Sequence, residues 1–322
     1  MVNSRVSIQL ITARAAISGS RPFFAAALFL ALLGCGIGAT KNYPVQGSAA
    51  VADIGGTPPA VLRAGAVASP DRFGAEAAQE ILNADGNAAD AAVATAFALA
   101  VTLPTAGNIG GGGFMTLWMD GKPYFLDYRE KAPAAAGPTM YLDADGNVVR
   151  GLSLNGSLAA GVPGSVAGMW EVHKKFGRLS WAQVIAPAIG YAKNGFIAYS
   201  TAKPATDPQR VNFNNYFGGK MVKGELFKQP ELAATLQRIS DYGKDDFYQG
   251  KTAELLVTQM GRTGGLITRN DLKDYNVVWR EPVAINWNGY TIYTAPPPSS
   301  GGCGIEQLRK MKQVLATNFA KA

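Results

Sequence analysis

Histidine and cysteine, on which many catalytic and metal sites depend, are almost missing from this sequence. The 322 residues include one histidine, His173, and two cysteines, Cys35 and Cys303. A structural zinc site needs several clustered cysteine or histidine ligands, so no metal site is predicted. Two cysteines are also too few for a disulfide framework. A Ser-His-Asp triad would have to use His173, whose charged neighbours instead predict a solvated helix face.

Charged residues are scarce as well, and their distribution is uneven. They make up 16% of the chain against 48% hydrophobic residues, a balance that excludes intrinsic disorder and allows a large core. Of the net charge of +7, residues 1–35 carry +3 and residues 303–322 carry +3, which leaves +1 for the body. The sequence has neither a cluster of basic residues nor a Walker-type glycine loop, so neither a nucleic acid nor a nucleotide is predicted as a partner.

The amino-terminal residues have the pattern of an export signal. An uninterrupted apolar run spans residues 23–34, three arginines precede it, and the first acidic residue is Asp53. Small residues follow the run, as is typical of a signal peptide. The alternative is a transmembrane anchor, although the charge-free stretch 23–39 is short for the roughly 20 residues that a spanning helix needs.

The end of this run, Leu32-Leu33-Gly34-Cys35, is similar to a bacterial lipoprotein box, in which the cysteine is lipidated and becomes the first mature residue. Residues 1–35 are therefore predicted to be a signal peptide. The protein is predicted to be exported, either as a periplasmic protein or as a lipoprotein anchored to the membrane through Cys35. If Cys35 is lipidated or removed, Cys303 has no disulfide partner.

Helical and strand patterns alternate after a linker, predicted at residues 36–60 from their Gly, Pro, Ser and Thr content. Caps and apolar spacing predict helices at residues 69–84, 87–101, 163–176, 180–194, 230–242 and 251–261. A hairpin is predicted from strands at residues 114–119 and 124–129, and two or three further strands over residues 277–295. The fold class is therefore α+β with layered packing.

The carboxyl-terminal residues predict a turn at 296–302 and then an amphipathic helix at 303–322. The apolar residues of this stretch recur with the spacing of one helical face. They are Ile305, Leu308, Met311, Leu315 and Phe319.

Residues 110–113 form a run of four glycines between a predicted helix and a predicted strand. A phosphate-binding loop has the opposite order, because it follows a strand and opens a helix. The run therefore predicts a close approach of two backbone segments or a positive φ rather than a nucleotide site.

Arg129 is the sharpest candidate for a binding residue, because it lies at the end of a predicted apolar strand. A guanidinium held at a strand end can present two parallel donors to a carboxylate. From spacing alone, an ordinary ion pair with Asp127 or Glu130 is the favoured alternative. Asp90 lies on a predicted helix that is apolar nearly all round, so its carboxylate also needs a partner. Structural hydrogen bonding is the favoured role of Asp90.

Several stretches taken together resemble the γ-glutamyltranspeptidase (glutathione hydrolase) family. They cover about residues 61–302, in the family's order and with similar spacing. The matching stretches are residues 65–70, 81–94, 108–115, 127–133, 161–168, 271–282 and 296–302. The combination is specific, although each glycine-rich piece alone is common.

The resemblance implies the large-subunit half of an αββα amino-terminal-nucleophile hydrolase. In that family one precursor cleaves itself into a large and a small subunit, and the new amino-terminal Thr attacks the γ-glutamyl amide of glutathione or a similar compound. The γ-glutamyl group then passes to water or to an amino-acid or peptide acceptor. No metal or organic cofactor is implied.

Arg129 matches the large-subunit arginine that binds the α-carboxylate of the γ-glutamyl group in this family. With the resemblance, binding of a carboxylate is favoured over an ordinary ion pair as the role of Arg129. The family's small subunit begins with a motif such as Thr-Thr-His. This sequence contains no Thr-Thr pair, and its one histidine does not follow a Thr. No catalytic residue is therefore expected in this chain. It is expected to be a large-subunit portion that stops before the catalytic Thr, inactive alone, with a small subunit as its partner.

Two alternatives remain at this point. The chain could be a catalytically inactive exported remnant, or a carboxylate-binding protein that uses the region of Arg129. It could also belong to a related acylase that acts on another amide, although the match at residues 127–133 favours γ-glutamyl substrates.

Overall fold

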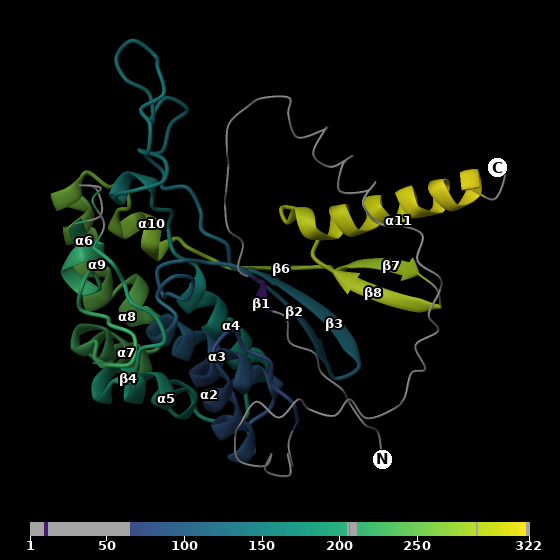
Figure 1. Ribbon diagram of the computed structural model, residues 1–322, viewed down its shortest axis with the longest axis horizontal. Coiled ribbons are helices and arrows are strands. Elements are labelled where there is room, and N and C mark those ends of the chain that lie inside the picture. The colour runs from purple at the N-terminus through teal and green to yellow at the C-terminus, as the bar shows by residue number, and fades with distance from the viewer. Residues whose placement is uncertain (1–9, 12–64, 205, 207–210, 288, 320–322) are drawn as a thin grey trace. The chain divides into compact units, whose positions relative to one another are not determined.

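The computed structural model describes residues 10–11, 65–204, 206, 211–287 and 289–319 (Figure 1). Apart from residues 10–11, the predicted signal peptide 1–35, with its Cys35, and the predicted linker 36–60 lie outside the described residues. Among the helices that are described, none is both long and apolar enough to cross a membrane.

The first two helices form a closely packed pair whose starts are encoded locally. Asp71 caps α2 (Arg72–Asn83) by accepting the Gly74 N–H at 2.7 Å. Asn87 and Asp90 form a capping box at the start of α3 (Ala88–Thr102). Nearly every residue of α3 is buried, as its apolar sequence predicts, because it packs against α2, α4 (Ser165–Phe176) and α5 (Trp181–Asn194).

The remaining helices lie further along the chain. The long ones are α7 (Pro230–Tyr242), which agrees with the prediction, α9 (Lys251–Thr263) and α11 (Ser300–Phe319). The short helices were not predicted, because they have too few residues for a clear apolar period. These are η1 (Ser157–Ala159), α6 (Val211–Tyr216), α8 (Lys244–Tyr248) and α10 (Arg269–Lys273).

The main sheet is antiparallel, with the strand order β1-β2-β3-β6. Its strands are β1 (Leu10–Ile11), β2 (Phe114–Met119), β3 (Lys122–Asp127) and β6 (Val278–Arg280). Asp120 and Gly121 both have positive φ at the β2–β3 turn, as a tight hairpin requires. The register places Phe125 of β3 opposite Arg280 of β6, although 155 positions separate them.

Two smaller sheets complete the strands of the described chain. They are β4 (Phe196–Ile197) with β5 (Leu226–Phe227), and β7 (Val283–Trp287) with β8 (Tyr290–Thr294). The strands predicted over residues 277–295 are thus confirmed as β6, β7 and β8.

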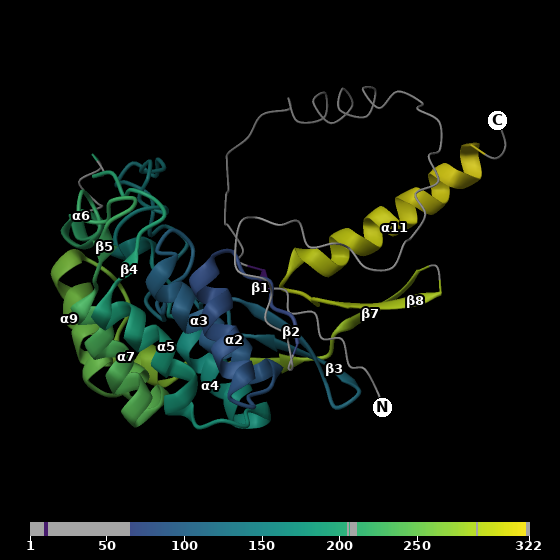
Figure 2. The same ribbon diagram turned by 60° about the horizontal axis from the view of Figure 1, so that its bottom comes forward.

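Helices and sheet share one hydrophobic core, which confirms the α+β class. Figure 2 shows α2, α3 and α4 beside the β2–β3 hairpin. Phe97 of α3 and Val166 of α4 are buried in the same cluster as Met115 of β2 and Leu126 of β3. The two layers therefore bury their apolar faces against each other.

The helix α11 begins earlier than the sequence predicts. It starts at Ser300, so the last residues of the predicted turn 296–302 and the predicted boundary at residue 303 fall within the helix. Its predicted apolar face is exposed: Leu308 is 67% and Met311 59% accessible. Residues of α11 contact β7. Since apolar helix faces are normally covered, this face is available to another polypeptide.

Candidate functional site

Arg129 lies two residues after β3, where the strand turns away from its sheet partner. Tyr128 still pairs with Gly113, since each donates its N–H to the other's carbonyl oxygen, at 2.9 and 3.2 Å. The Arg129 N–H then donates to Asp127 Oδ1 at 3.1 Å and closes a side-chain-capped turn. Its side chain is exposed, and the guanidinium carbon lies 5.7 Å from the centre of the Phe114 ring.

The carboxylate of Asp127 pairs with Arg280 rather than with Arg129. Arg280 donates Nε at 2.9 Å and Nη2 at 2.8 Å to Asp127 Oδ2. Asp127 is only 8% accessible, so its charge needs this partner. Within the described part of the chain, the guanidinium of Arg129 forms no ion pair with Asp127 or Glu130. The alternative of an ordinary local ion pair is therefore wrong.

The glycine run 110–113 lies against the backbone at Arg129. A Cβ atom added to Gly112 would lie 2.5 Å from Tyr128 O, 2.7 Å from Glu130 N and 2.9 Å from Arg129 C. None of these glycines has a positive φ. The run thus serves the close approach of two backbone segments, one of the two roles predicted for it.

Tyr275 holds the backbone on the other side of Arg129. Its hydroxyl donates to the Arg129 carbonyl oxygen at 2.7 Å. Burial, together with the nearby carboxylates of Asp127 and Glu130, raises the pKa of Tyr275 above its usual value. The hydroxyl therefore stays protonated and can donate this hydrogen bond throughout the neutral pH range.

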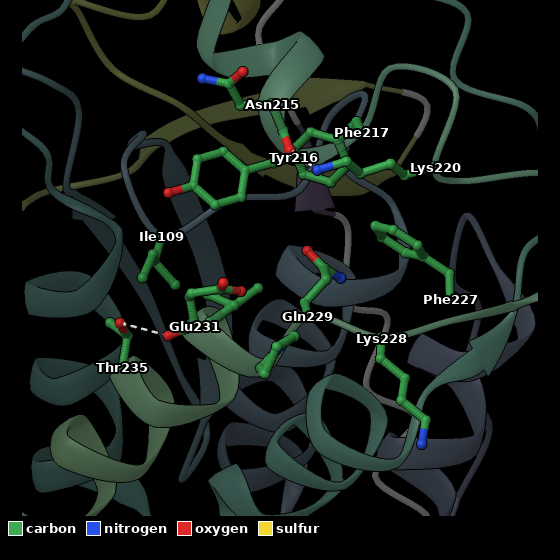
Figure 3. A pocket seen from close by; sticks show the side chains of 12 residues that line it. Ile109, Asn215, Tyr216, Phe217, Lys220, Phe227, Lys228, Gln229, Glu231 and Thr235 are labelled. Atoms are coloured by element: carbon green, nitrogen blue, oxygen red, sulfur yellow. Dashed lines mark hydrogen bonds between the residues drawn. The ribbon is translucent and has the colours of Figure 1, made fainter.

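A hollow of about 610 Å³ lies near the start of the glycine run, between α6, β5 and the first turn of α7. Figure 3 shows Ile109, Tyr216 and Gln229 around it. Gln229 is buried and donates Nε2 to the Val101 carbonyl at 2.8 Å, a contact that ties the start of α7 to α3. Arg129 does not line this hollow.

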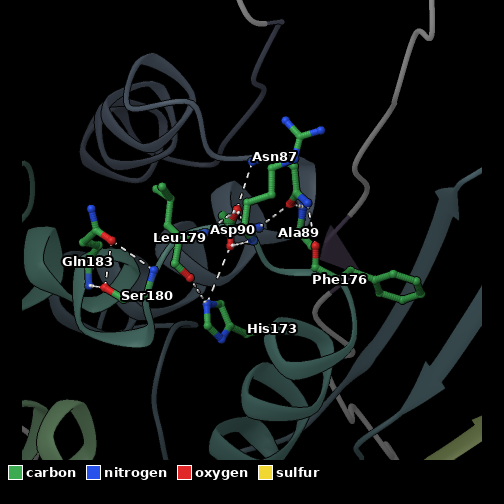
Figure 4. A network of polar contacts seen from close by, with 9 residues as sticks. Asn87, Ala89, Asp90, His173, Phe176, Leu179, Ser180 and Gln183 are labelled. Atoms are coloured by element: carbon green, nitrogen blue, oxygen red, sulfur yellow. Dashed lines mark hydrogen bonds and ion pairs between the residues drawn. The ribbon is translucent and has the colours of Figure 1, made fainter.

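The predicted structural role of Asp90 is confirmed (Figure 4). Its fully buried carboxylate accepts the N–H of Asn87 at 2.9 Å, of Arg178 at 3.0 Å and of Leu179 at 3.4 Å. These contacts join the start of α3 to the loop between α4 and α5. A buried carboxylate that accepts backbone donors from two elements holds those elements together, which is a structural role.

The predicted solvated setting of His173 is wrong. Its side chain is 13% accessible, and Nε2 donates to the Leu179 carbonyl at 2.8 Å. The same nitrogen lies 3.7 Å from Asp90 Oδ1, and the ring packs on Trp181. Its charged neighbours Lys174 and Lys175 are exposed to solvent. Because adjacent residues of a helix point in different directions, His173 faces α5 instead. The one histidine is thus half-buried against the core rather than solvated.

Replacing Asp90 with alanine is expected to lower the free energy of unfolding by about 3 kcal/mol or more, because buried N–H groups would lose their acceptor. A urea titration of the purified chain, followed by circular dichroism of its helices, measures this change. Asp241→Ala is the matched control, since Asp241 is exposed and accepts only a surface hydrogen bond from Gln237. Equal midpoints for the two variants would contradict the bracing role of Asp90.

Metal ligands do not gather in the residues that the structure describes: no group of three or more His, Cys, Asp or Glu side chains could hold an ion. Cys303 is free and exposed on α11. The chemistry available at Arg129 is therefore that of a positioned cation, which recognises an anion such as a carboxylate.

Arg129 was predicted as a site residue, but the residues that hold it were not. Tyr275 and Arg280 both lie in the matching stretch 271–282, and Asp127 lies in the matching stretch 127–133. The occurrence of both stretches in one family was a usable signal that they meet in space. Nothing in their spacing along the chain indicates which side chains touch.

Comparison with known proteins gives a consistent result. A family model described as Gamma-glutamyltranspeptidase matches residues 74–322. A glutathione hydrolase proenzyme from Pseudomonas aeruginosa is 58% identical over 266 residues, which cover 81% of this chain and 48% of that protein. The corresponding proenzyme from Escherichia coli is 41% identical over 261 residues, which cover 78% of this chain and 45% of that protein. The chain thus spans about half the length of these relatives.

Solved structures show the same relationship. One is the γ-glutamyltranspeptidase from Pseudomonas nitroreducens, solved in complex with L-DON, with a TM-score of 0.75 and 57% identity. The match covers 80% of this chain and 78% of the solved chain. The Helicobacter pylori γ-glutamyltranspeptidase has a TM-score of 0.68 and 43% identity, with coverages of 76% and 73%.

Proposed function

Because this chain belongs to the γ-glutamyltranspeptidase family, we propose that it is the large-subunit portion of an enzyme that cleaves the γ-glutamyl amide of glutathione and related compounds. Its α+β fold is part of the αββα amino-terminal-nucleophile hydrolase architecture of its structural relatives. The family match disfavours the alternatives of an inactive remnant and of a carboxylate-binding protein.

The observation that carries this proposal is the exposed guanidinium of Arg129, which has no ion-pair partner among the residues that the structure describes and follows a backbone that lies against the glycine run. Its two parallel N–H donors fit the α-carboxylate of a γ-glutamyl group. Held in this way, the substrate presents its γ-carbonyl at a fixed distance from the cation, which orients it for attack. Arg129 binds and orients the substrate, and takes no part in bond making.

The bond-making group comes from the partner subunit. The Thr hydroxyl of a small subunit adds to the γ-carbonyl, its α-amine takes the proton, and the amide C–N bond breaks as the amine leaves. Water or an acceptor amine then attacks the resulting ester and frees the Thr. No cofactor is needed for either step.

A small subunit as partner is supported by the exposed apolar face of α11, on which Ile305, Leu308, Met311 and Leu315 are all accessible. It is also supported by the description of the relatives as proenzymes and by their about twofold greater length. An apolar helix face of this kind is stabilised when another polypeptide covers it.

The purified chain is expected to release no glutamate from glutathione above background, because the proposed nucleophile belongs to the small subunit. Co-expression with the carboxyl-terminal part of the P. aeruginosa relative gives what we call the reconstituted complex, which is expected to be active. The measurement is release of p-nitroaniline from γ-glutamyl-p-nitroanilide. Activity of the chain alone, or an inactive complex that nevertheless assembles, would contradict the proposal.

We also propose the organisation of the chain: a signal peptide at residues 1–35, a linker at 36–60 and the large-subunit region from residue 61 onward, which includes the helix α11 from Ser300. The protein is exported, and Cys35 carries its lipid if the lipoprotein box is used. Mass spectrometry of the amino-terminal peptide of the mature protein tests this proposal. An unprocessed terminus would contradict the signal peptide, and a processed terminus without lipid would contradict the anchor at Cys35.

A further inference from the structure

Residues 271–280 contact the backbone and side chains around Arg129 at several points. We call residues 127–134 the arginine segment and residues 271–280 the clamp. More than 130 positions separate the two in sequence. Both belong to the stretches that first indicated the family, yet the chemistry of the proposed reaction uses only Arg129. The question is what the clamp does for that residue.

The first contact is made by the Tyr275 hydroxyl, which donates to the Arg129 carbonyl oxygen at 2.7 Å. The Tyr275 ring is itself held, since it stacks on Tyr248 with 5.7 Å between ring centres and 13° between planes. Tyr248 in turn donates to the Pro163 carbonyl at 2.9 Å and accepts the Ala167 N–H at 3.2 Å, at the start of α4. The carbonyl of Arg129 is thereby tied to the helical layer.

The second contact is made by Arg280, which gives two donors to Asp127 Oδ2. Asp127 Oδ1 remains available to cap the Arg129 N–H at 3.1 Å. Asp127 is buried and lies only two residues from Arg129. A buried carboxylate without a partner attracts any cation that can reach it. By satisfying Asp127, Arg280 leaves the guanidinium of Arg129 free for an external carboxylate.

Two further contacts fix the end of the arginine segment. Lys131 donates Nζ to the Asn276 carbonyl at 2.8 Å and lies 5.1 Å from the centre of the Tyr275 ring. The Ala134 N–H donates to Asp271 Oδ1 at 2.7 Å. The clamp therefore touches the segment before, at and after Arg129.

We propose that Tyr275 and Arg280 are positioning residues for substrate capture: Tyr275 sets the backbone at Arg129, and Arg280 keeps Asp127 from sequestering its guanidinium. This inference rests on the proposed function of Arg129. Neither residue touches the reacting atoms, so each acts on how well the γ-glutamyl group is held.

The test uses the reconstituted complex with γ-glutamyl-p-nitroanilide. Tyr275→Phe removes one hydrogen bond and is expected to raise KM about fivefold with kcat within about twofold of the unaltered value. Arg280→Met is expected to raise KM roughly 10-fold to 100-fold, because a charge-assisted contact is lost and Arg129 turns to Asp127. Tyr290→Phe and Arg269→Met are the matched controls, since both side chains are exposed and neither contacts the arginine segment.

A double variant separates positioning from a purely structural role. Adding Asp127→Asn to Arg280→Met removes the charge that would capture Arg129 but keeps an Oδ1 acceptor for its N–H. The double variant is expected to regain at least about tenfold of the lost kcat/KM if Arg280 acts by satisfying Asp127. A structural role predicts that the second substitution makes the loss worse, and that result would overturn the inference.

Hydrogen exchange on the purified chain keeps the inference testable if a variant assembles poorly. Tyr275→Phe and Arg280→Met are expected to speed exchange within residues 127–134 and leave α3 unchanged. Uniform acceleration across the chain, or none, would overturn it. If Arg129→Lys leaves KM unaltered, the proposed function fails. If Arg129→Lys raises KM while the Tyr275 and Arg280 variants do not, only this inference fails.

Discussion

Replacing Arg129 with alanine is expected to lower kcat/KM of the reconstituted complex roughly 30-fold to several thousand-fold, the equivalent of about 2–5 kcal/mol for truncating one partner of a held charge pair. The loss is expected mainly in KM, because the carboxylate contact exists before bond making begins. Initial rates with γ-glutamyl-p-nitroanilide over a range of concentrations measure both constants.

The lysine variant makes the result specific. Arg129→Lys keeps the positive charge but replaces a planar two-donor fork with a single ammonium, so a loss of about tenfold or more is expected. Arg150→Ala is the control, since Arg150 is an exposed arginine on a different loop. Equal kinetics of Arg129→Lys and the unaltered complex would refute the role given to Arg129.

Replacing Gly112 with alanine is expected to cost roughly 100-fold in kcat/KM, although Gly112 itself binds nothing. The added methyl group would lie within 3 Å of backbone atoms of Tyr128, Arg129 and Glu130, and backbone cannot rotate away as a side chain can. The arginine segment must therefore shift, and a displacement of about 1 Å at an orienting residue is enough for a loss of this size. Overpacking of this kind also costs stability, by about 1–3 kcal/mol.

Gly110→Ala is the matched control within the same run of glycines. The nearest atom to an added Cβ there is Asn108 Oδ1 at 3.8 Å, an ordinary contact, and φ is not positive. Its kinetics and unfolding midpoint are expected to stay near those of the unaltered protein. Equal losses for the two variants would mean that the run acts through flexibility rather than through the close approach at Gly112.

Much of the fold could be predicted because its elements are encoded locally. Cap residues and the apolar period behind them predict α2, α3 and α5 to within a few residues. The sequence predicts Ser69 as the cap of the first helix, but the structure has Asp71 as its N-cap, so α2 begins later, at Arg72. The Asp120-Gly121 turn predicts the β2–β3 hairpin. The short helices α6, α8 and α10 escaped prediction because five or six residues do not establish a period, and packing decides their conformation.

The setting of a side chain was harder to predict than the element that carries it. His173 lies on the predicted helix α4, but its neighbours in sequence suggested solvent, whereas its neighbours in space are Asp90, Leu179 and Trp181. The α3–α4–α5 packing that brings these residues together involves chain separations of more than 80 positions for the Asp90 contacts. Local composition contains no record of such contacts.

The same distinction applies to the candidate site. The order of residues predicts an arginine at the end of an apolar strand, and the resemblance of the motifs implies an α-carboxylate as its ligand. Whether that guanidinium is paired depends on long-range contacts that exist only in the folded chain. Antiparallel pairing of β3 with β6 brings Arg280 to Asp127. Since this cation satisfies the buried carboxylate, Arg129 has no ion-pair partner in the described part of the chain.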